Sequence, residues 1–409
     1  MILESEPVLP QGWRRVILRD VCEKIMVGIA SAATHAYSDG GILMLRNLNI
    51  KEGYIDNTDL LYISEEYEKS HKNKRLKIGD VITVRTGYPG VSAVVDGEFE
   101  GAQCFTSLIT RPIKSLIDSR FLCEYINSPI GKLFIMGAEA GGAQKNVNAG
   151  ALQTMPLILP PLPEQRRISS ILSQWDDSLS VLSRLIDAKR RQKRGLADQL
   201  LTGKRRLTGF EDDWSAHPLG FLLLSKPKIR AGGADYPILS VTVDGVKLQG
   251  EYFNKRVASE NIGDYLVVER GEIAMSGLNF WMGAIGMQSI VDAGVISPAY
   301  KVFKINGQLI NSNYAMHFVR SETMLSILLE SSVQGASIVR RNLNMRALTN
   351  ALVRLPSLPE QQAIAAFLST LDSEIASLEA LKAKVAEQKR GLMDALLTGR
   401  VRVNVEDVS

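Results

Sequence analysis

The chain has 409 residues, of which 45% are hydrophobic and 22% charged, enough apolar content to bury one or more cores. At about 150 residues per domain this length corresponds to two or three domains. The formal net charge of +4 neither requires nor excludes a polyanionic partner. The three cysteines, Cys22, Cys104 and Cys123, lack C-x-x-C spacing, which argues against a disulfide framework and against a thiolate zinc site.

The sequence predicts no membrane-associated segment. No stretch approaches the roughly 18 apolar residues that a membrane span needs. Residues 1–12 carry Glu4 and Glu6 where a secretory signal would have basic residues followed by an apolar run. We therefore expect a cytoplasmic protein without a membrane partner.

The first block, residues 1–155, has the pattern of an α+β domain. It opens near Trp13 and Leu18, and a Gly-acid turn leads into a strand-like run at residues 78–84. Further strand-like runs lie at 93–95 and 108–110, and residues 120–126 have a helical pattern.

Residues 156–210 predict one long helix. Pro163 stands where a first-turn proline is tolerated, and Gly203 is a typical stop. Apolar residues recur between them at steps of four and three, which predicts a heptad seam. At about 1.5 Å per residue, such a helix spans about 60 Å and needs a partner helix. The seam residues of this segment are Trp175, Leu179, Leu182 and Ile186.

Residues 211–352 predict a second α+β domain of the same design. Trp214 and Leu219 open it at places that match Trp13 and Leu18 of the first block, which puts a short linker at about residues 208–213. A Gly-acid turn again precedes a strand-like run at 270–275, a further run follows at 300–303, and residues 313–329 have a helical pattern.

Residues 353–409 predict a second long helix, from Pro359 to Gly399, with Leu371, Ile375 and Leu378 in its seam. Residues 355–403 aligned without a gap on residues 159–207 give about 23 identities in 49 positions, so the helical segment is an internal repeat. We expect the two helices to pair. Lysines interrupt the seam in its second half, where the pair is expected to splay or to take a partner; they are Lys189, Lys193, Lys382 and Lys389.

A search for catalytic motifs finds none. The chain has no phosphate-binding G-x-x-x-x-G-K-[ST] loop and no G-x-G-x-x-G after a strand. Its four histidines are far apart and form no H-E-x-x-H motif, so no metal ligand set is expected. Ser276 lacks the G-x-S-x-G context of a nucleophile. We expect a protein without catalytic or metal-binding residues.

Positive charge is concentrated in residues 156–210, which hold 11 Lys and Arg against 5 Asp and Glu. These basic residues are able to face DNA phosphates. A solvated helix face, or a face for an acidic protein partner, is an equally good interpretation.

The two copies of L-P-x-L-P-E-Q, each followed by a long heptad helix that ends in Q-K-R-G-L and L-L-T-G, resemble the specificity subunit of Type I restriction-modification systems over essentially the whole chain. The resemblance implies an α+β fold class: two similar target-recognition domains, separated by two long antiparallel coiled-coil helices. It implies recognition domains at 1–155 and 211–352, and helical spacers at 156–210 and 353–409.

The resemblance also implies the partners and the reaction. Double-stranded DNA would be read at an asymmetric bipartite target, one half-site per recognition domain. Two methyltransferase subunits and two restriction subunits would join this non-catalytic subunit. S-adenosylmethionine, ATP and magnesium would be used by those partners, with no cofactor in this chain.

Candidate DNA-reading residues are polar side chains in loops, because base edges are read by Arg, Lys, Asn, Gln, Ser and Thr. In both blocks the alternative for each candidate is an ordinary surface or turn residue. The candidates in the first block are Arg46, Asn47, Asn49, Arg85, Thr86, Gln144 and Lys145; those in the second are Ser240, Ser276, Asn279, Arg340 and Arg341.

Two other functions remain open at the level of sequence. One is a coiled-coil interaction scaffold whose globular domains bind protein. A lack of salt-sensitive DNA binding would favour this function. The other is an enzyme with an unrecognised site, which methyl transfer by the isolated chain would favour.

Overall fold

A computed structural model describes residues 9–31, 34–137, 147–232, 235–252, 262–334 and 341–405. The chain divides into two compact units, one formed by residues 1–184 with 380–409 and the other by residues 185–379. Each unit combines one α+β domain with part of both long helices. The helices pass through both units, so the limits of the four predicted segments stay predictions.

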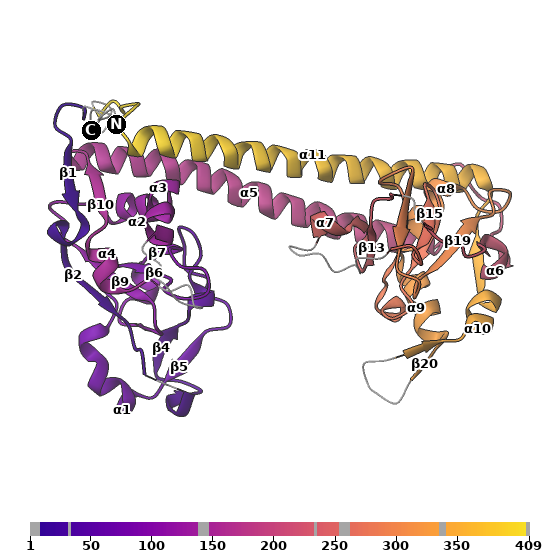
Figure 1. Cartoon of the computed structure of the whole chain (residues 1–409), viewed down its shortest axis with the longest axis horizontal. Coiled ribbons are helices and arrows are strands. Elements are labelled where there is room, and N and C mark those ends of the chain that lie inside the picture. The colour runs from indigo at the N-terminus through magenta and orange to yellow at the C-terminus, as the bar shows by residue number, and fades with distance from the viewer. Residues whose placement is uncertain are drawn as a thin grey trace. The chain divides into compact units, whose positions relative to one another are not determined.

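The two long helices form as the sequence predicts (Figure 1). They are α5 (Leu162–Leu201) and α11 (Leu358–Leu397), each of 40 residues. Each begins one residue before its proline and ends two residues before a glycine with positive φ, 73° at Gly203 and 74° at Gly399. Among the predicted seam residues, Ile186 and Ile375 are buried, and Trp175, Leu179, Leu182, Leu371 and Leu378 are half-buried.

The two helices run antiparallel in each unit, and lysines contribute to their pairing. In unit 2, Lys189 forms an ion pair with Glu374 at 2.6 Å, and Lys193 forms one with Asp372. In unit 1, Lys389 bonds both carboxylate oxygens of Asp176 at 2.7 Å. The expected splaying is not found at Lys189, Lys193 and Lys389, because acidic residues of the facing helix pair with them.

The Glu of each L-P-E-Q motif ties the start of one helix to the segment that follows the other. Arg402 donates two hydrogen bonds to Glu164 in unit 1, at 2.9 and 3.1 Å, and Arg206 does the same to Glu360 in unit 2, at 2.5 and 2.7 Å. Both glutamates are 1% exposed. Such bidentate pairs fix geometry as well as adding energy.

The Gln of the same motif attaches each α+β domain to its helix. Oε1 of Gln165 accepts a hydrogen bond from the backbone N–H of Asp118, at 2.8 Å, and Oε1 of Gln361 accepts one from Asn311, at 2.7 Å. Asp118 and Asn311 are in turn the N-cap residues of α2 (Ser119–Asn127) and α8 (Ser312–Phe318). The repeated motif thus makes the same joint twice.

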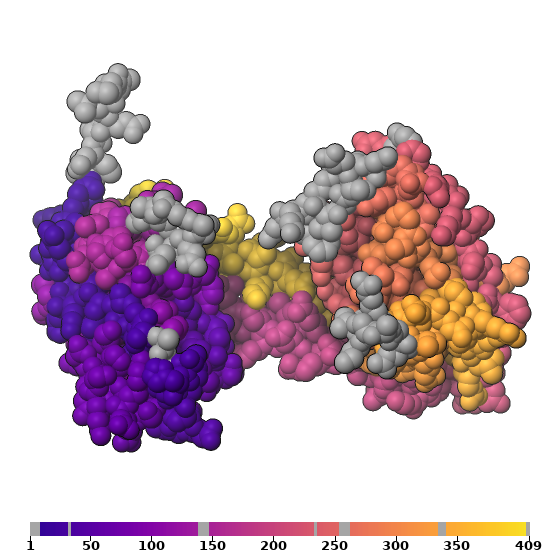
Figure 2. All heavy atoms as spheres, turned by 60° about the horizontal axis from the view of Figure 1, so that its bottom comes forward, coloured from indigo at the N-terminus to yellow at the C-terminus, as the bar shows by residue number. Residues whose placement is uncertain are grey.

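The two domains share one sheet topology, which confirms that they are similar. A four-stranded antiparallel sheet has the order β2-β9-β6-β7 in the first domain and β12-β19-β16-β17 in the second. A two-stranded ribbon in each domain, β1-β10 or β11-β22, pairs the domain's first strand with the strand that leads into a long helix. In Figure 2 the indigo and magenta atoms of the first ribbon adjoin.

The strands of the first domain are β1 (Arg14–Ile17), β2 (Cys22–Val27), β3 (Tyr37–Ser38), β4 (Ile42–Leu45), β5 (Leu61–Ile63), β6 (Val81–Thr83), β7 (Ser92–Val94), β8 (Gln103–Cys104), β9 (Leu108–Pro112) and β10 (Pro156–Leu159). Its helices are α1 (Glu65–Glu68), α2 (Ser119–Asn127), α3 (Pro129–Gly137) and α4 (Ala149–Gln153).

The strands of the second domain are β11 (Ser215–Pro218), β12 (Leu223–Ser225), β13 (Leu239–Thr242), β14 (Gly245–Leu248), β15 (Leu266–Glu269), β16 (Ile273–Met275), β17 (Ile285–Met287), β18 (Ala293–Ile296), β19 (Lys301–Ile305), β20 (Ser332–Gln334), β21 (Arg341–Leu343) and β22 (Leu352–Leu355). Its helices are α6 (Leu219–Leu222), α7 (Gln249–Tyr252), α8 (Ser312–Phe318), α9 (Glu322–Glu330) and α10 (Met345–Asn350).

The predicted helix at 313–329 is two helices, α8 and α9. Val319 ends the first, and Ser321 starts the second by accepting a hydrogen bond from the backbone N–H of Met324 at 3.2 Å. The sequence pattern missed this break because apolar residues resume at Met324 after only four polar residues, whereas a single serine cap is enough to start a new helix.

Each domain packs its sheet and one helix, α2 or α8, onto the long helices. In unit 1, Phe121 of α2 and Leu18 join one apolar core with Leu172 of α5 and Leu396 of α11. In unit 2, Tyr314 of α8 joins the corresponding core with Leu200 and Leu368. Trp13 and Trp214, which open the two domains, lie in these cores. Among the described residues no helix is both long and apolar enough to span a membrane.

Candidate nucleic-acid interface

Three loops of the first domain meet at one edge of its sheets. They follow β4, follow β6 and precede β9, and they meet because β6 ends where the antiparallel β9 begins. Asn47 joins them: its Nδ2 donates to the carbonyl and to the Oγ1 of Thr86, at 3.2 and 3.0 Å, and its Oδ1 accepts from Ser107 at 2.9 Å. The hydroxyl of Tyr88 donates to the Asn47 carbonyl at 2.8 Å.

Arg46 and Asn49 shape the first of these loops. Asn49 is fully buried and donates to the carbonyls of Asp56 and Thr58, at 3.3 and 2.9 Å, while its Oδ1 accepts from the Arg46 N–H. Its side chain thus holds the loop. Nη2 of Arg46 bonds the carboxylate of Asp59 at 2.8 Å, and its Nε is buried without a partner among the described residues.

The remaining candidates of the first domain lie at the same edge or outside the described residues. Arg85 is half-buried beside Thr86, and its carbonyl accepts a hydrogen bond from Val147 at 3.2 Å. Gln144 and Lys145 lie outside the described residues. The edge therefore brings Arg46, Asn47, Asn49, Arg85 and Thr86 together, with Asn47 as its connecting residue.

The second domain places Ser276 and Asn279 in the equivalent loop, after β16. Ser276 is 1% exposed and its Oγ accepts from the backbone N–H of Leu278 and of Asn279, at 3.3 and 3.1 Å, so it forms the turn. Asn279 is exposed and precedes the short helix η6 (Phe280–Met282). Ser240 lies apart on β13, where it is buried and accepts from Gln249 at 3.2 Å.

Gly277 allows this turn to pass close to the loop before β19. A Cβ at Gly277 would lie 2.0 Å from the carbonyl oxygen of Ala299, closer than any real contact. We expect Gly277→Ala to destabilise unit 2 by about 2–3 kcal/mol, because backbone must shift to admit the methyl group. Gly307→Ala, with open space around its Cβ, is the matched control and should change stability by less than about 0.5 kcal/mol. Chemical unfolding measures both, and equal effects would contradict this interpretation.

Arg341 is held beside the Asn279 loop. Its guanidinium lies over the ring of Trp281, 5.5 Å from the centroid, and its Nη1 donates to Ser332 Oγ at 2.9 Å. A planar guanidinium restrained in this way loses little further freedom when it donates to a base or a phosphate. Arg340 lies outside the described residues. Arg341 and Asn279 therefore come together at one end of the second domain.

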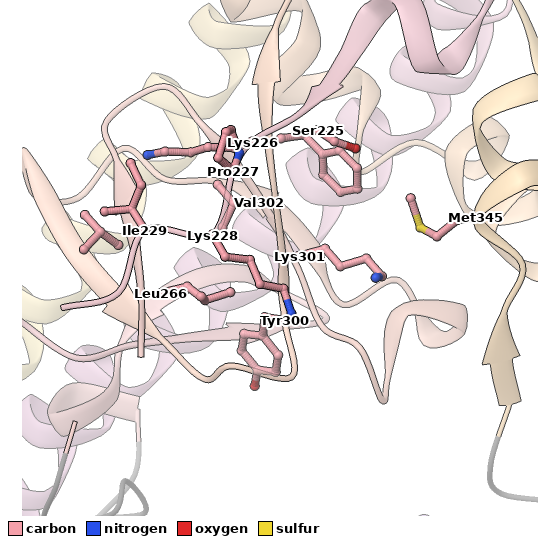
Figure 3. Close-up of a pocket in the computed structure, with 12 residues that line it drawn as sticks. Ser225, Lys226, Pro227, Lys228, Ile229, Leu266, Tyr300, Lys301, Val302 and Met345 are labelled. Atoms are coloured by element: carbon pink, nitrogen blue, oxygen red, sulfur yellow. The ribbon is translucent and has the colours of Figure 1, made fainter. Parts of the chain in front are cut away.

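The lysines around a small pocket in the second domain were missed by the sequence analysis. The pocket has a volume of about 180 Å³, and Figure 3 shows Lys226, Lys228, Lys301 and Tyr300 among its lining residues. Lys226 is buried and bonds Glu272 at 2.8 Å. Lys228 and Lys301 have no acidic partner within 4 Å among the described residues, so they are candidates for phosphate contacts.

The pocket does not suit a large cofactor, since ligand sites usually measure about 300–1,000 Å³. Within the described ranges no three His, Cys, Asp or Glu side chains are grouped to hold a metal ion. Ser215 and His217 do hydrogen-bond at 2.7 Å, but no carboxylate is bonded to this half-buried histidine in the described structure.

The comparisons with known proteins agree with this architecture. The family model for the Type I restriction modification DNA specificity domain matches residues 10–188 and 225–387. The chain belongs to the family of type I restriction-modification specificity subunits. The two matched stretches correspond to the two copies of the α+β design.

Two curated relatives cover the chain to different extents. A protein of Methanocaldococcus jannaschii assigned as the MjaX specificity subunit of a type I restriction enzyme is 25% identical, over 97% of this chain and 95% of its own length. The EcoKI specificity subunit of Escherichia coli K12 is 24% identical over 48% of this chain and 44% of its own.

A chain from a structural study of assembly and conformational transition of the type I system has a TM-score of 0.60 at 17% identity, covering 97% of this chain and all of that one. The S subunit from M. genitalium has a TM-score of 0.51 at 13% identity, covering 97% of this chain and 98% of that one. These similarities support the fold.

Proposed function

We propose that this chain is the DNA-reading subunit of a type I restriction-modification complex, and that each of its two α+β domains reads one half of an asymmetric bipartite target. The observation that carries this proposal is the duplication. The same four-stranded sheet occurs twice, each α+β domain is joined to a long helix through the same Gln contact, and each has a polar loop edge.

The two polar edges differ where their folds match. The first carries Asn47 and Thr86 in one hydrogen-bonded group, whereas the second carries Asn279 beside the Arg341–Trp281 stack. Different donors and acceptors at matched places are what reading two different half-sites requires. We propose that the segments of α5 and α11 act as the spacer between the half-sites, because half-site spacing on DNA is set by protein geometry.

The partners are proposed on the same basis. The solved relative with the higher TM-score comes from a study of complex assembly in a type I system. We propose that two methyltransferase and two restriction subunits assemble on this chain, and that they bind S-adenosylmethionine, ATP and magnesium. The long helices expose large apolar side chains that suit a protein partner; they include Val181, Leu185, Phe367 and Leu381.

Five of the 11 basic residues in the segment 156–210 are engaged within the protein, which limits their part in DNA binding. Lys189, Lys193 and Arg190 form ion pairs with acidic residues of α11. Arg206 bonds Glu360, and Lys204 bonds Asp198 at 3.1 Å. We therefore assign the proposed phosphate contacts to the domains, with Lys228 and Lys301 as candidates in the second.

A salt titration of DNA binding tests this proposal. We expect the full chain, in complex with its methyltransferase, to bind duplex DNA with an affinity that falls by about 0.9 log units per log unit of salt for each phosphate contact. Lys228→Gln together with Lys301→Gln should reduce that slope by about two. An affinity for duplex DNA that is absent or independent of salt would instead favour a protein-binding scaffold.

A further inference from the structure

Each unit contains a partly buried charged cluster where its domain meets the long helices. The repeat places the same pair in both: Lys389 with Asp176 in unit 1, and Lys193 with Asp372 in unit 2, each partner separated from its counterpart by the repeat offset of 196 residues. The third member of each cluster comes from the domain. It is Glu124 of α2 in unit 1 and His317 of α8 in unit 2.

Glu124 and His317 occupy the same place in the two domains. The N-cap residues Asp118 and Asn311 are equivalent, because both bond the Gln of the L-P-E-Q motif. Glu124 and His317 each follow that N-cap by six residues (124 − 118 and 317 − 311). The helices therefore present different titratable groups to the same Lys–Asp pair.

We propose that Glu124 and His317 are positioning residues that hold each domain on its Lys–Asp pair, and that acid strengthens this attachment in unit 1 but weakens it in unit 2. The attachment itself follows from the contacts in each unit. Its consequence, that the two half-sites are held with opposite pH dependence, rests on the proposed function.

In unit 1 two carboxylates share one lysine. Lys389 is 7% exposed and lies 2.7 Å from both oxygens of Asp176 and 3.5 Å from Glu124. Burial raises the pKa of Glu124 to about 7; Lys389 opposes this, and Asp176 and Glu52 add to it. Glu52, on a loop, is itself paired with Lys132 at 2.8 Å.

The direction of the pH dependence of attachment in unit 1 follows from proton binding. Glu124 has a pKa of about 7 when the domain is attached and an ordinary value of 4.5 when it is released, so the attached form binds the extra proton between these values. The contribution of Glu124 to attachment is therefore complete below pH 4.5 and is lost as pH rises through about 7.

In unit 2 the domain contributes His317, which lies beside the Lys193–Asp372 pair. Nε2 of His317 lies 3.2 Å from Ser369 Oγ, and its Nδ1 lies 3.9 Å from Asp372, whose carboxylate is already paired with Lys193. Burial lowers the pKa of His317, the charge of Lys193 lowers it further, and Asp372 opposes them; Arg320, after α8, adds to the lowering.

The pH dependence of attachment in unit 2 has the opposite direction. With a pKa below the ordinary 6.5 in the attached form, His317 binds its proton more readily when the domain is released. Its contribution to attachment is present above pH 6.5 and is lost as pH falls through the lowered value. This junction also borders a cavity of about 510 Å³ lined by Arg194, Ala197 and His317, where unit 1 has the buried Met393 in place of Ala197.

Hydrogen exchange of the full chain without DNA tests the proposal, because peptides from α2 and α8 report the two attachments separately. After correction for the intrinsic exchange rate, we expect protection of α2 to rise about tenfold from pH 8 to pH 6, while protection of α8 falls as pH drops below 6.5. Glu124→Gln should flatten only the α2 profile, and His317→Gln only the α8 profile. Glu100→Gln, at an exposed glutamate, is the matched control and should alter neither.

The proposal would be overturned if protection of α2 and protection of α8 changed with pH in the same direction. It would also be overturned if the pH dependence of protection persisted in the Gln variants. Because the measurement contains no DNA, its failure would leave the proposed DNA-reading function untouched. Conversely, loss of DNA binding in the salt titration would leave the exchange result standing.

Discussion

Lys389→Met should destabilise unit 1 by about 3–5 kcal/mol at pH 8, the largest effect that we expect from the loss of one buried charge. Methionine fills a similar volume but leaves Glu124 and Asp176 facing each other without a cation. Removing one partner of a buried ion pair strands the other charge in a poorly solvated site. Denaturant unfolding followed by hydrogen exchange in α2 measures the loss.

Lys384→Met is the matched control for this substitution. It makes the same change on the same helix at an exposed position, and should alter stability by less than about 0.5 kcal/mol. Adding Glu124→Gln to Lys389→Met should recover part of the lost stability, because one stranded carboxylate becomes neutral. Equal stability of Lys389→Met and Lys384→Met would show that the cluster contributes nothing to the attachment.

Arg341→Ala should weaken specific DNA binding by about 10- to 100-fold, that is by about 1–3 kcal/mol, and relax the sequence preference in one half-site only. The expectation rests on the guanidinium being held over Trp281 at the edge of the second domain, beside Asn279. Arg341→Lys keeps the charge but loses the planar donor group, so it should restore salt-dependent affinity without restoring the preference.

Arg346→Ala, at an exposed arginine of α10, is the control for the change in charge. It should lower affinity for all sequences by a similar factor or not at all, and leave the recognised half-site intact. Selection of bound sequences from a random DNA pool measures these differences. If Arg341→Ala keeps both half-sites at full affinity, Arg341 is not a reading residue.

The helical framework could be predicted from sequence because its signals are local. Pro163 and Gly203 bracket one long helix, and the repeat shows the same helix again from Pro359 to Gly399. The break between α8 and α9 was missed because it depends on a single cap at Ser321. The lysines of the seam were misinterpreted because their acidic partners lie on another element, as with Lys389 and Asp176.

The candidate interface could be predicted only in part. The Gly-acid turns led to the loops after β6 and β16, and thus to Thr86 and Asn279. The contacts that organise those loops, such as Ser107 bonded to Asn47 or Arg341 over Trp281, join segments far apart in the sequence and carry no local signal. Asn49 illustrates the reverse case, because it is a polar loop residue whose side chain donates its hydrogen bonds to carbonyls of its own loop.

The central claim is that each domain reads one half of a split target. Its most direct test is to express the chain with the methyltransferase encoded beside it, in a host without adenine methylation, and to map N6-methyladenine by single-molecule sequencing. We predict an asymmetric motif of two half-sites separated by a fixed gap, with one half relaxed by Arg341→Ala. Absence of methylation although the complex forms, or an uninterrupted motif, would contradict it.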